Sequence, residues 1–322
     1  MLRDYLRYFG FKIIIFLCHI LPARFLYWIA LRVADLNYFL FDPRGRESVK
    51  ANLRRVLPDA SEERIAYEAR WVFRNFGKYL TEFFRFRSFD RRFFLKHVAI
   101  CGREHIDAAL AQGRGALIVS AHLSNWELGA AGLKVISGYP VNVVVMMHRY
   151  GKVNNLFVRE RESVGVRMID TLVASRPVYR ALERNEIVCM LGDRDPTEQG
   201  IWIKFFGQPC RFAQGPARFA IRSGAPIIPA YALRRTNDSF TLYFLPPIIA
   251  SDPSTWRGVT LEEAMYDPNP RRLAGKNTHP RPRDAQVRAI MQAYARVIEE
   301  VIRWHPEEWG VFYRVWEEEW QK

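Results

Sequence analysis

Cysteine is scarce in this sequence of 322 residues, and no two cysteines are spaced as a CxxC pair. The four cysteines are spread along the chain, as Cys18, Cys101, Cys189 and Cys210. This spacing gives no support to a disulfide scaffold or a structural zinc site, and no other cluster of metal ligands is evident. We expect the cysteines to be reduced, mostly buried small hydrophobic residues of a protein in a reducing compartment.

The sequence also lacks an unbroken apolar segment of the about 20 residues that a membrane-spanning helix needs. Near the N-terminus, Pro22 and Arg24 separate the uncharged run from Ile13 onward from the apolar segment Phe25–Leu31. An acidic residue, early aromatics and the lack of a clean cleavage site make a secretory signal a poor match. We therefore expect residues 1–40 to form membrane-associating helices that lie in the interface. A helix pair buried against the rest of the protein is the alternative.

Acidic residues are few relative to basic ones: 34 Asp and Glu against 48 Lys and Arg, a formal net charge of +14. Such an excess suits an anionic partner, and phosphorylated lipid, a membrane surface and nucleic acid all satisfy it. Arginines alternate with aromatics at Phe83–Arg87, where they could stack on bases. The apolar and aromatic residues that follow Ser61, a candidate N-cap, recur at helical spacing. This pattern instead favours a helix with a solvated basic face over an aromatic core.

Hydrophobic residues make up 49% of the chain, which supplies the core of a globular protein. Short β-branched runs alternate with helical stretches after residue 97. This pattern predicts an α/β fold with a mostly parallel central sheet covered by helices on both faces. Residues 41–322 are expected to form one such domain. The candidate strands are Gly115–His122, Val141–Met147, Glu186–Asp193, Ala225–Leu233 and Ser239–Pro247.

The first candidate strand ends in His122, and Glu127 follows in the first turn of the next helix. Ligands of such sheets usually bind at the carboxyl ends of the strands. Glu127 could orient the imidazole, which would leave its other nitrogen free to act as a base toward a hydroxyl. Ser124 and Glu127 also fit a capping box, in which the carboxylate only satisfies a backbone N–H. Spacing alone does not separate these roles.

A second strand end carries Asp193, Arg194 and Asp195. Two carboxylates here are compatible with a metal site of the kind that sugar-nucleotide transferases use. Ion pairs that hold a loop are the preferred interpretation, because Arg194 already supplies positive charge. Pro216 and Gly224 then mark the beginning and end of a helix.

The segment HLSNWE has the HX4E form of the lysophospholipid and lipid A acyltransferase superfamily. Three further blocks occur in the order in which the family has them. They are GRESVKANLRRVLPDASEERI with NFGKYLTEFFRF, GDRDPTEQGIWIKFFGQPCRF with GPARFAIRSGAPIIP, and HPEEWGVFYRVW. Over residues 40 to 316 the chain therefore resembles the late (secondary) acyltransferases of lipid A biosynthesis, and a phosphatidylinositol mannoside acyltransferase shares these blocks.

This resemblance implies an enzyme of lipopolysaccharide biosynthesis at the cytoplasmic face of the inner membrane. It would transfer a fatty acyl chain from an acyl carrier protein or CoA thioester to a hydroxyl of a glycolipid, without a cofactor or metal. His122 would be the general base and Glu127 its orienting partner. The residues expected to contact substrates are Asn125, Arg159, Arg161, Arg194, Asp195 and Arg314. The basic run at 271–283 is a further candidate for binding phosphate or an acidic carrier protein.

The C-terminal block departs from the family pattern, because Tyr313, Arg314, Val315 and Trp316 replace a more basic run and three glutamates follow. The acceptor could therefore be another glycolipid or a phospholipid. Two other function classes are also considered. Metal dependence would indicate a sugar-nucleotide transferase that uses Asp193 and Asp195, and salt-sensitive binding without turnover would indicate a non-catalytic binder of nucleic acid or anionic membrane.

Overall fold

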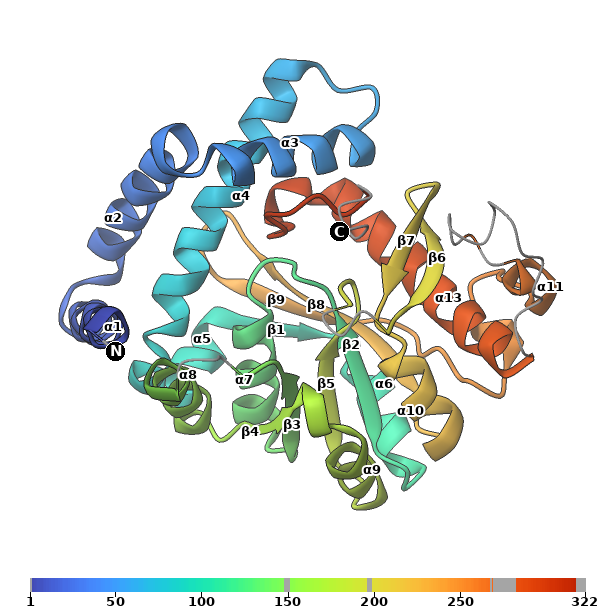
Figure 1. Ribbon diagram of the computed structural model, residues 1–322. Helices are drawn as coiled ribbons and strands as arrows, with labels where there is room; N and C mark the ends of the chain where they lie inside the picture. The colour runs from blue at the N-terminus through green and yellow to red at the C-terminus, as the bar shows by residue number, and fades with distance from the viewer. Residues whose placement is uncertain (1, 148–150, 196–198, 267, 269–281, 317–322) are drawn as a thin grey trace.

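A seven-stranded sheet forms the centre of the computed structural model, which describes all residues except 1, 148–150, 196–198, 267, 269–281 and 317–322 (Figure 1). The strand order is β1-β9-β8-β2-β5-β3-β4. All neighbouring strands are parallel except β8 and β9, which are antiparallel. The prediction of a mostly parallel sheet is confirmed. The strands are β1 (Val98–Cys101), β2 (Ala116–Ser120), β3 (Val141–Val145), β4 (Arg167–Asp170), β5 (Ile187–Leu191), β8 (Ile227–Arg234) and β9 (Phe240–Phe244).

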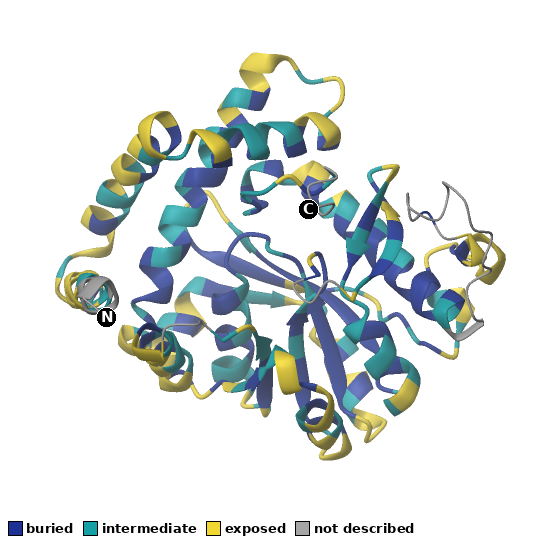
Figure 2. Cartoon of the chain, in the orientation of Figure 1, coloured by how far each residue is buried: buried dark blue, intermediate teal, exposed yellow. Residues whose placement is uncertain are grey.

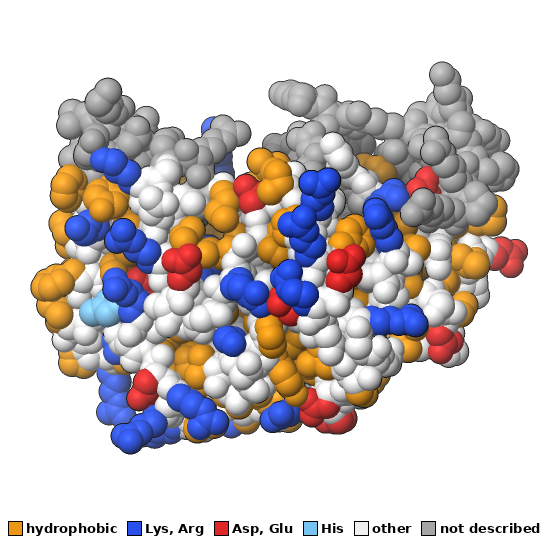
Figure 3. Space-filling view, turned by 90° about the horizontal axis from the view of Figure 1, so that it is seen from below, with side chains coloured by type: hydrophobic (Ala, Val, Ile, Leu, Met, Phe, Trp, Pro, Cys, Tyr) orange, Lys and Arg blue, Asp and Glu red, His pale blue; other side chains and the backbone are white. Residues whose placement is uncertain are grey.

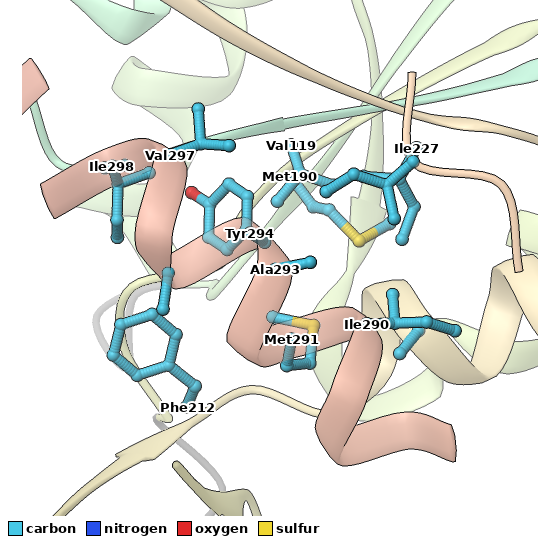
Figure 4. Close-up of a cluster of buried hydrophobic side chains, with 14 of the residues drawn as sticks. Val119, Met190, Phe212, Ile227, Ile290, Met291, Ala293, Tyr294, Val297 and Ile298 are labelled. Carbon is cyan, nitrogen blue, oxygen red and sulfur yellow. The ribbon is translucent and has the colours of Figure 1, made fainter. Parts of the chain in front are cut away.

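Helices cover both faces of the sheet, which explains why its central strands are apolar throughout (Figure 2). One face packs on α9 (Ser175–Glu183), α10 (Gly215–Ser223) and α13 (Pro282–Trp304). The other packs on α5 (Arg91–His97), α6 (Arg103–Ala111) and α7 (Trp126–Ser137). In Figure 4, Ile290 and Tyr294 of α13 lie with Val119 and Met190 of the sheet in one buried cluster. The apolar side of α13 thus faces the core.

Helix α4 (Glu62–Phe83) carries the aromatic stripe that the sequence predicts. Ser61 is its N-cap, since its hydroxyl accepts a hydrogen bond from the Arg64 backbone N–H at 3.3 Å. Val72, Phe73 and Phe83 are buried. This arrangement supports the interpretation of the region as a basic face over an aromatic core. Helix α3 (Pro43–Val56) packs beside α4.

The N-terminal region forms two helices, α1 (Leu2–Ile20) and α2 (Ala23–Leu36), which separate at Pro22 and continue into a π-helical turn, Asn37–Phe41. One face of α2 packs on α4, where Asp35 accepts bidentate hydrogen bonds from Arg70 and Arg74. None of the described helices has both the length and the hydropathy for a membrane span. Interfacial membrane attachment stays a prediction.

A two-stranded hairpin, β6 (Ile201–Phe205) and β7 (Gln208–Phe212), stands beside α13 (Figure 1). Phe206 and Gly207, which both have positive φ, form its turn, and the sequence does not predict its two strands. The predicted limits of α10 are confirmed, with Pro216 in its first turn and Gly224 as a left-handed C-cap. The remaining elements are α8 (Gly151–Ser163), α11 (Leu261–Met265) and the 3₁₀ turns Phe86–Ser88, Thr171–Val173, Pro253–Thr255 and Pro306–Glu308.

Candidate active site

His122 and Asp193 meet at the carboxyl end of the sheet. Strands β2 and β5 are adjacent and parallel, and their register pairs Ser120 with Leu191, so the residues two positions further on lie side by side. Asp193 Oδ1 is 2.9 Å from His122 Nδ1, and Asp193 Oδ2 accepts from the His122 backbone N–H at 2.9 Å. One carboxylate therefore holds both the ring and the backbone of the histidine.

The environment of Asp193 keeps its carboxylate ionised. Burial alone would raise its pKa, but the neighbouring imidazole and its hydrogen bonds outweigh burial, and the pKa is lowered. Trp309 Nε1 donates to Asp193 Oδ2 at 3.3 Å and contributes to this effect. An ionised Asp193 favours the tautomer in which Nδ1 carries the proton. The other ring nitrogen, Nε2, then carries the lone pair that a general base needs.

This arrangement corrects the predicted partner of His122. Glu127 was expected to orient the imidazole, but its carboxylate is bound by Arg161, whose Nε donates at 2.9 Å. Both side chains of this ion pair are nearly buried, and the Arg161 guanidinium also lies over the Phe83 ring. The reason is topological: Glu127 is in the first turn of α7 beside α8, whereas β5 is the direct neighbour of β2.

The capping box is also absent, because α7 begins one residue later than that motif requires. Asn125 is the N-cap, and its Oδ1 accepts from the Leu128 backbone N–H at 2.9 Å. Its side-chain N–H donates to Glu82 at 2.6 Å, and Asn125 is fully buried. Asn125 therefore positions the start of α7 and lies outside the lining of the cavity that His122 faces, which gives no support to its predicted contact with substrate.

The second acidic residue of the GDRD segment holds a loop. Asp195 is buried, forms an ion pair with Arg211 at 3.1 Å and accepts from the Gly200 backbone N–H. The preferred ion-pair interpretation is confirmed for Asp195, whereas Asp193 forms hydrogen bonds with His122. Across the described residues, no group of three or more His, Cys, Asp and Glu side chains is arranged for a metal ion.

The three remaining predicted arginines occupy different environments. Arg194 is exposed at the rim of the site, with its guanidinium 5.1 Å from the centre of the Tyr313 ring. Arg159 on α8 and Arg314 in the C-terminal segment are exposed and lie outside the lining of the cavity that His122 faces. The structure therefore brings Arg194, but not Arg159 or Arg314, into the cavity wall. Most of the basic run at 271–283 lies outside the described residues.

A cavity of about 970 Å³ reaches the His122 ring. Its polar part is lined by His122, Glu127, Arg161, Arg194 and Asp195. The apolar part extends between α7 and the sheet, where the small residues Gly129, Ala230 and Ala232 line it. Deeper along the strands it is lined by Ile118, Leu133, Val143 and Cys189. His122 is thus placed where polar and apolar ligand groups can meet.

The C-terminal segment contributes to the site in a way that the sequence did not reveal. Leu123 forms an antiparallel bridge with Trp309, and the Gly310 backbone N–H donates to the His122 carbonyl at 2.8 Å. The block HPEEWG is visible as a motif, but its distance in sequence from His122 gives no physical signal of contact. The pairing of Asp193 with His122 would need the strand order, which the sequence does not specify.

Comparison with known proteins adds an independent result. A family described as bacterial lipid A biosynthesis acyltransferase matches residues 1–318. Phosphatidylinositol mannoside acyltransferases of Mycobacterium tuberculosis (strain ATCC 25618 / H37Rv) and Mycolicibacterium smegmatis are 30% and 29% identical over 196 and 192 residues. These alignments cover 58% of this chain in both cases, and 61% and 62% of the relatives. A lipid A biosynthesis acyltransferase of Haemophilus influenzae is 27% identical over 138 residues, 42% of this chain and 43% of the relative. The chain thus aligns with about three fifths of the length of the mycobacterial relatives.

Proposed function

The chain belongs to the bacterial lipid A biosynthesis acyltransferase family, and from this premise we propose that it is an O-acyltransferase. It transfers a fatty acyl chain from the thioester of an acyl carrier protein or CoA to a hydroxyl of a membrane glycolipid. The observation that supports this most directly is the His122–Asp193 pair beside a large, mainly apolar cavity. A histidine base and a hydrocarbon binding space are the two elements that such a transfer requires.

In the proposed reaction, His122 Nε2 takes the proton of the acceptor hydroxyl as its oxygen attacks the thioester carbonyl carbon. The C–S bond breaks, an ester forms, and the proton leaves with the thiolate as a thiol. Asp193 stabilises the imidazolium that exists between these proton transfers, because it already binds Nδ1. No acyl-enzyme is needed, since a thiolate is a good leaving group.

The acyl chain occupies the apolar part of the cavity. The small residues Gly129, Ala230 and Ala232 are close to His122 and provide space for the first methylenes. Ile118, Leu133 and Val143 form the deeper part and contact the distal carbons. The chain then lies with its carbonyl carbon at the imidazole, as transfer to a hydroxyl demands.

The polar part of the cavity binds the acceptor headgroup. A lipid A-type precursor is the first candidate, because of the family and the Haemophilus influenzae relative. The mycobacterial relatives make a phosphatidylinositol mannoside or another glycolipid the second. Arg194 at the rim suits a phosphate or sugar hydroxyls in either case.

The N-terminal helices attach the enzyme to the cytoplasmic face of the inner membrane, where both glycolipids would be accessible. Large apolar side chains on α1 and α2 are exposed, including Phe16 at 62%, Trp28 at 55% and Val33 at 58%. Basic residues such as Lys12, Arg24 and Arg32 lie among them. This combination fits the headgroup and acyl boundary of an anionic bilayer.

The face in Figure 3 shows Lys and Arg side chains interspersed with hydrophobic and acidic ones, unlike the continuous basic stripe of a nucleic-acid binder.

Two measurements test the proposal. Mass spectrometry of lipids from cells with and without the protein should reveal an acceptor that differs by one acyl group. In vitro, His122→Ala should lower the rate of transfer by about 10²- to 10⁴-fold, since general base catalysis contributes that much. His97→Ala on α5 is the matched control and should keep wild-type activity. Unchanged lipids together with no transfer by the wild-type protein from either donor would reject the function, whereas an H122A variant as active as wild type would reject His122 as the base.

A further inference from the structure

A buried carboxylate, Glu82, lies directly behind the segment that carries His122. Only 2% of Glu82 is exposed. It accepts hydrogen bonds from the Tyr27 hydroxyl at 2.6 Å, from Asn125 Nδ2 at 2.6 Å and from Arg234 Nη2 at 2.9 Å. Both carboxylate oxygens are therefore used, and the guanidinium of Arg234 balances the charge.

The partners of Glu82 come from separate parts of the fold. Tyr27 is in α2, Glu82 is in α4, Arg234 is the last residue of β8, and Asn125 is the N-cap of α7. A charged acceptor forms stronger hydrogen bonds than a neutral one, particularly in a dry interior. Glu82 thus forms hydrogen bonds both to α2 and to the N-cap of α7.

Asn125 transmits this restraint to the catalytic segment. Because its amide N–H binds Glu82 and its oxygen caps α7, the side chain has only one orientation that satisfies both bonds. Two residues, Leu123 and Ser124, separate Asn125 from His122, and Ser124 has a φ of 53° that non-glycine residues rarely adopt. Such a conformation persists only where the surroundings enforce it.

We propose that Glu82 is a positioning residue for catalysis: through Asn125 it fixes the segment His122–Asn125, and through Tyr27 it connects this segment to α2. The inference rests on the proposed acyltransferase function, in which His122 is the base. Glu82 itself is absent from the lining of the cavity, so it acts through Asn125. Its effect is on where the imidazole lies when the hydroxyl arrives.

Glu82→Gln is the main test, because the amide keeps the shape of the side chain and removes its charge. We expect kcat to fall about 10- to 100-fold, because a small misplacement of the catalytic base lowers the rate by this much, with KM within about twofold of wild type. Amide hydrogen exchange at residues 122–128 should accelerate about tenfold, with no change in β2. Burial raises the pKa of Glu308 to about 7, and this carboxyl near Arg234 can ionise and balance the guanidinium in the variant.

Tyr27→Phe is the second variant, since it removes one hydrogen bond and no charge. It should accelerate exchange at 122–128 less than Glu82→Gln does, and lower kcat less. The matched controls are Glu263→Gln, which alters an exposed glutamate bound to Arg296, and Tyr139→Phe, which alters a partly buried tyrosine bound to Asp107. Neither should change exchange at 122–128.

Three results would overturn the proposal. These are unchanged exchange at 122–128 in Glu82→Gln, exchange that rises equally across the whole sheet, or a loss of activity that resides in KM alone. If the wild-type protein transfers no acyl group from any donor, the proposed function fails. The exchange comparison still decides in that case whether Glu82 fixes the segment.

Discussion

His122 depends on side chains that are far apart in the sequence. Asp193 binds its ring and its backbone, and Trp309 binds Asp193 in turn. Asp193 is buried, while His122 keeps part of its ring at the cavity. A buried acceptor with a restrained geometry can hold one tautomer of the imidazole, which a solvated acceptor on a mobile side chain could not.

Asp193→Asn should lower kcat by about 10²- to 10⁴-fold with little change in KM, because an amide can stabilise the wrong tautomer and cannot stabilise the imidazolium. Steady-state kinetics with an acyl thioester donor measures this. Asp252→Asn, which alters a partly buried aspartate that caps a 3₁₀ turn, is the control and should be as active as wild type. An active Asp193→Asn variant would mean that Glu127 or another group orients His122.

At the scale of secondary-structure elements, the amino ends of β3, β4 and β5 are held together by Glu186. It accepts hydrogen bonds from Asn142 at 2.9 Å and Arg184 at 2.9 Å, and pairs with Arg167 at 2.9 Å. Burial alone would raise the pKa of Glu186, but these partners outweigh burial and lower the pKa to about 2. The cluster lies at the edge of the sheet opposite His122 and stabilises the fold.

Glu186→Gln should reduce the free energy of unfolding at pH 7 by about 1–2 kcal/mol, a value discounted because Arg167 and Arg184 are half exposed. The folded-state pKa is below the ordinary value of 4.5, so the stabilisation is complete above pH 4.5 and is lost as the pH falls toward 2. In urea unfolding experiments, the difference in the free energy of unfolding between variant and wild type should become smaller over that pH range. The exposed Glu104→Gln is the control, and a difference that grows in acid would contradict the assignment.

Leu133 on α7 allows a test of whether the cavity sets the preferred length of the acyl chain. It is 2% exposed and lines the deep apolar part with Ile118 and Val143. Leu133→Ala should shift the preferred acyl donor toward chains longer by about two to three methylenes, at a stability cost of about 2–5 kcal/mol. Leu117→Ala is the matched control, because Leu117 is equally buried on the opposite face of the sheet. It should cost similar stability without changing chain-length preference, and an equal shift in both variants would contradict the role of Leu133.

For the whole molecule, the sequence predicts the central strands and several helix limits, because long apolar runs and caps act locally. The cap Ser61, the helix Gly215–Ser223 and strands such as β2 are examples. The sequence does not predict strands β1 and β4, since four residues give too short a pattern. His122 was found at a strand end, but Asp193 was not recognised as its partner. The order of strands depends on packing across the whole chain, which no local pattern encodes.

The proposed membrane attachment through α1 and α2 predicts how the whole molecule should meet a bilayer. Phe25 and Trp28 are exposed on α2, with their rings stacked 6.0 Å apart. Trp28→Ser should weaken binding to anionic phospholipid vesicles by about tenfold or more, since burial of a large side chain contributes about 1.5–3 kcal/mol. Trp304→Ser at the end of α13 is the control, because Trp304 is 81% exposed and belongs to another surface. Equal binding of the two variants to vesicles in a sedimentation assay would contradict attachment through α2.

The exposed apolar side chains of α1 and α2 have a practical consequence for purification. In a buffer without detergent, these side chains have no lipid to contact, and copies of the protein should cluster through them. A particle mass measured in that buffer would report this clustering and not a native subunit count. The number of subunits should therefore be measured by light scattering in a mild detergent above its critical micelle concentration.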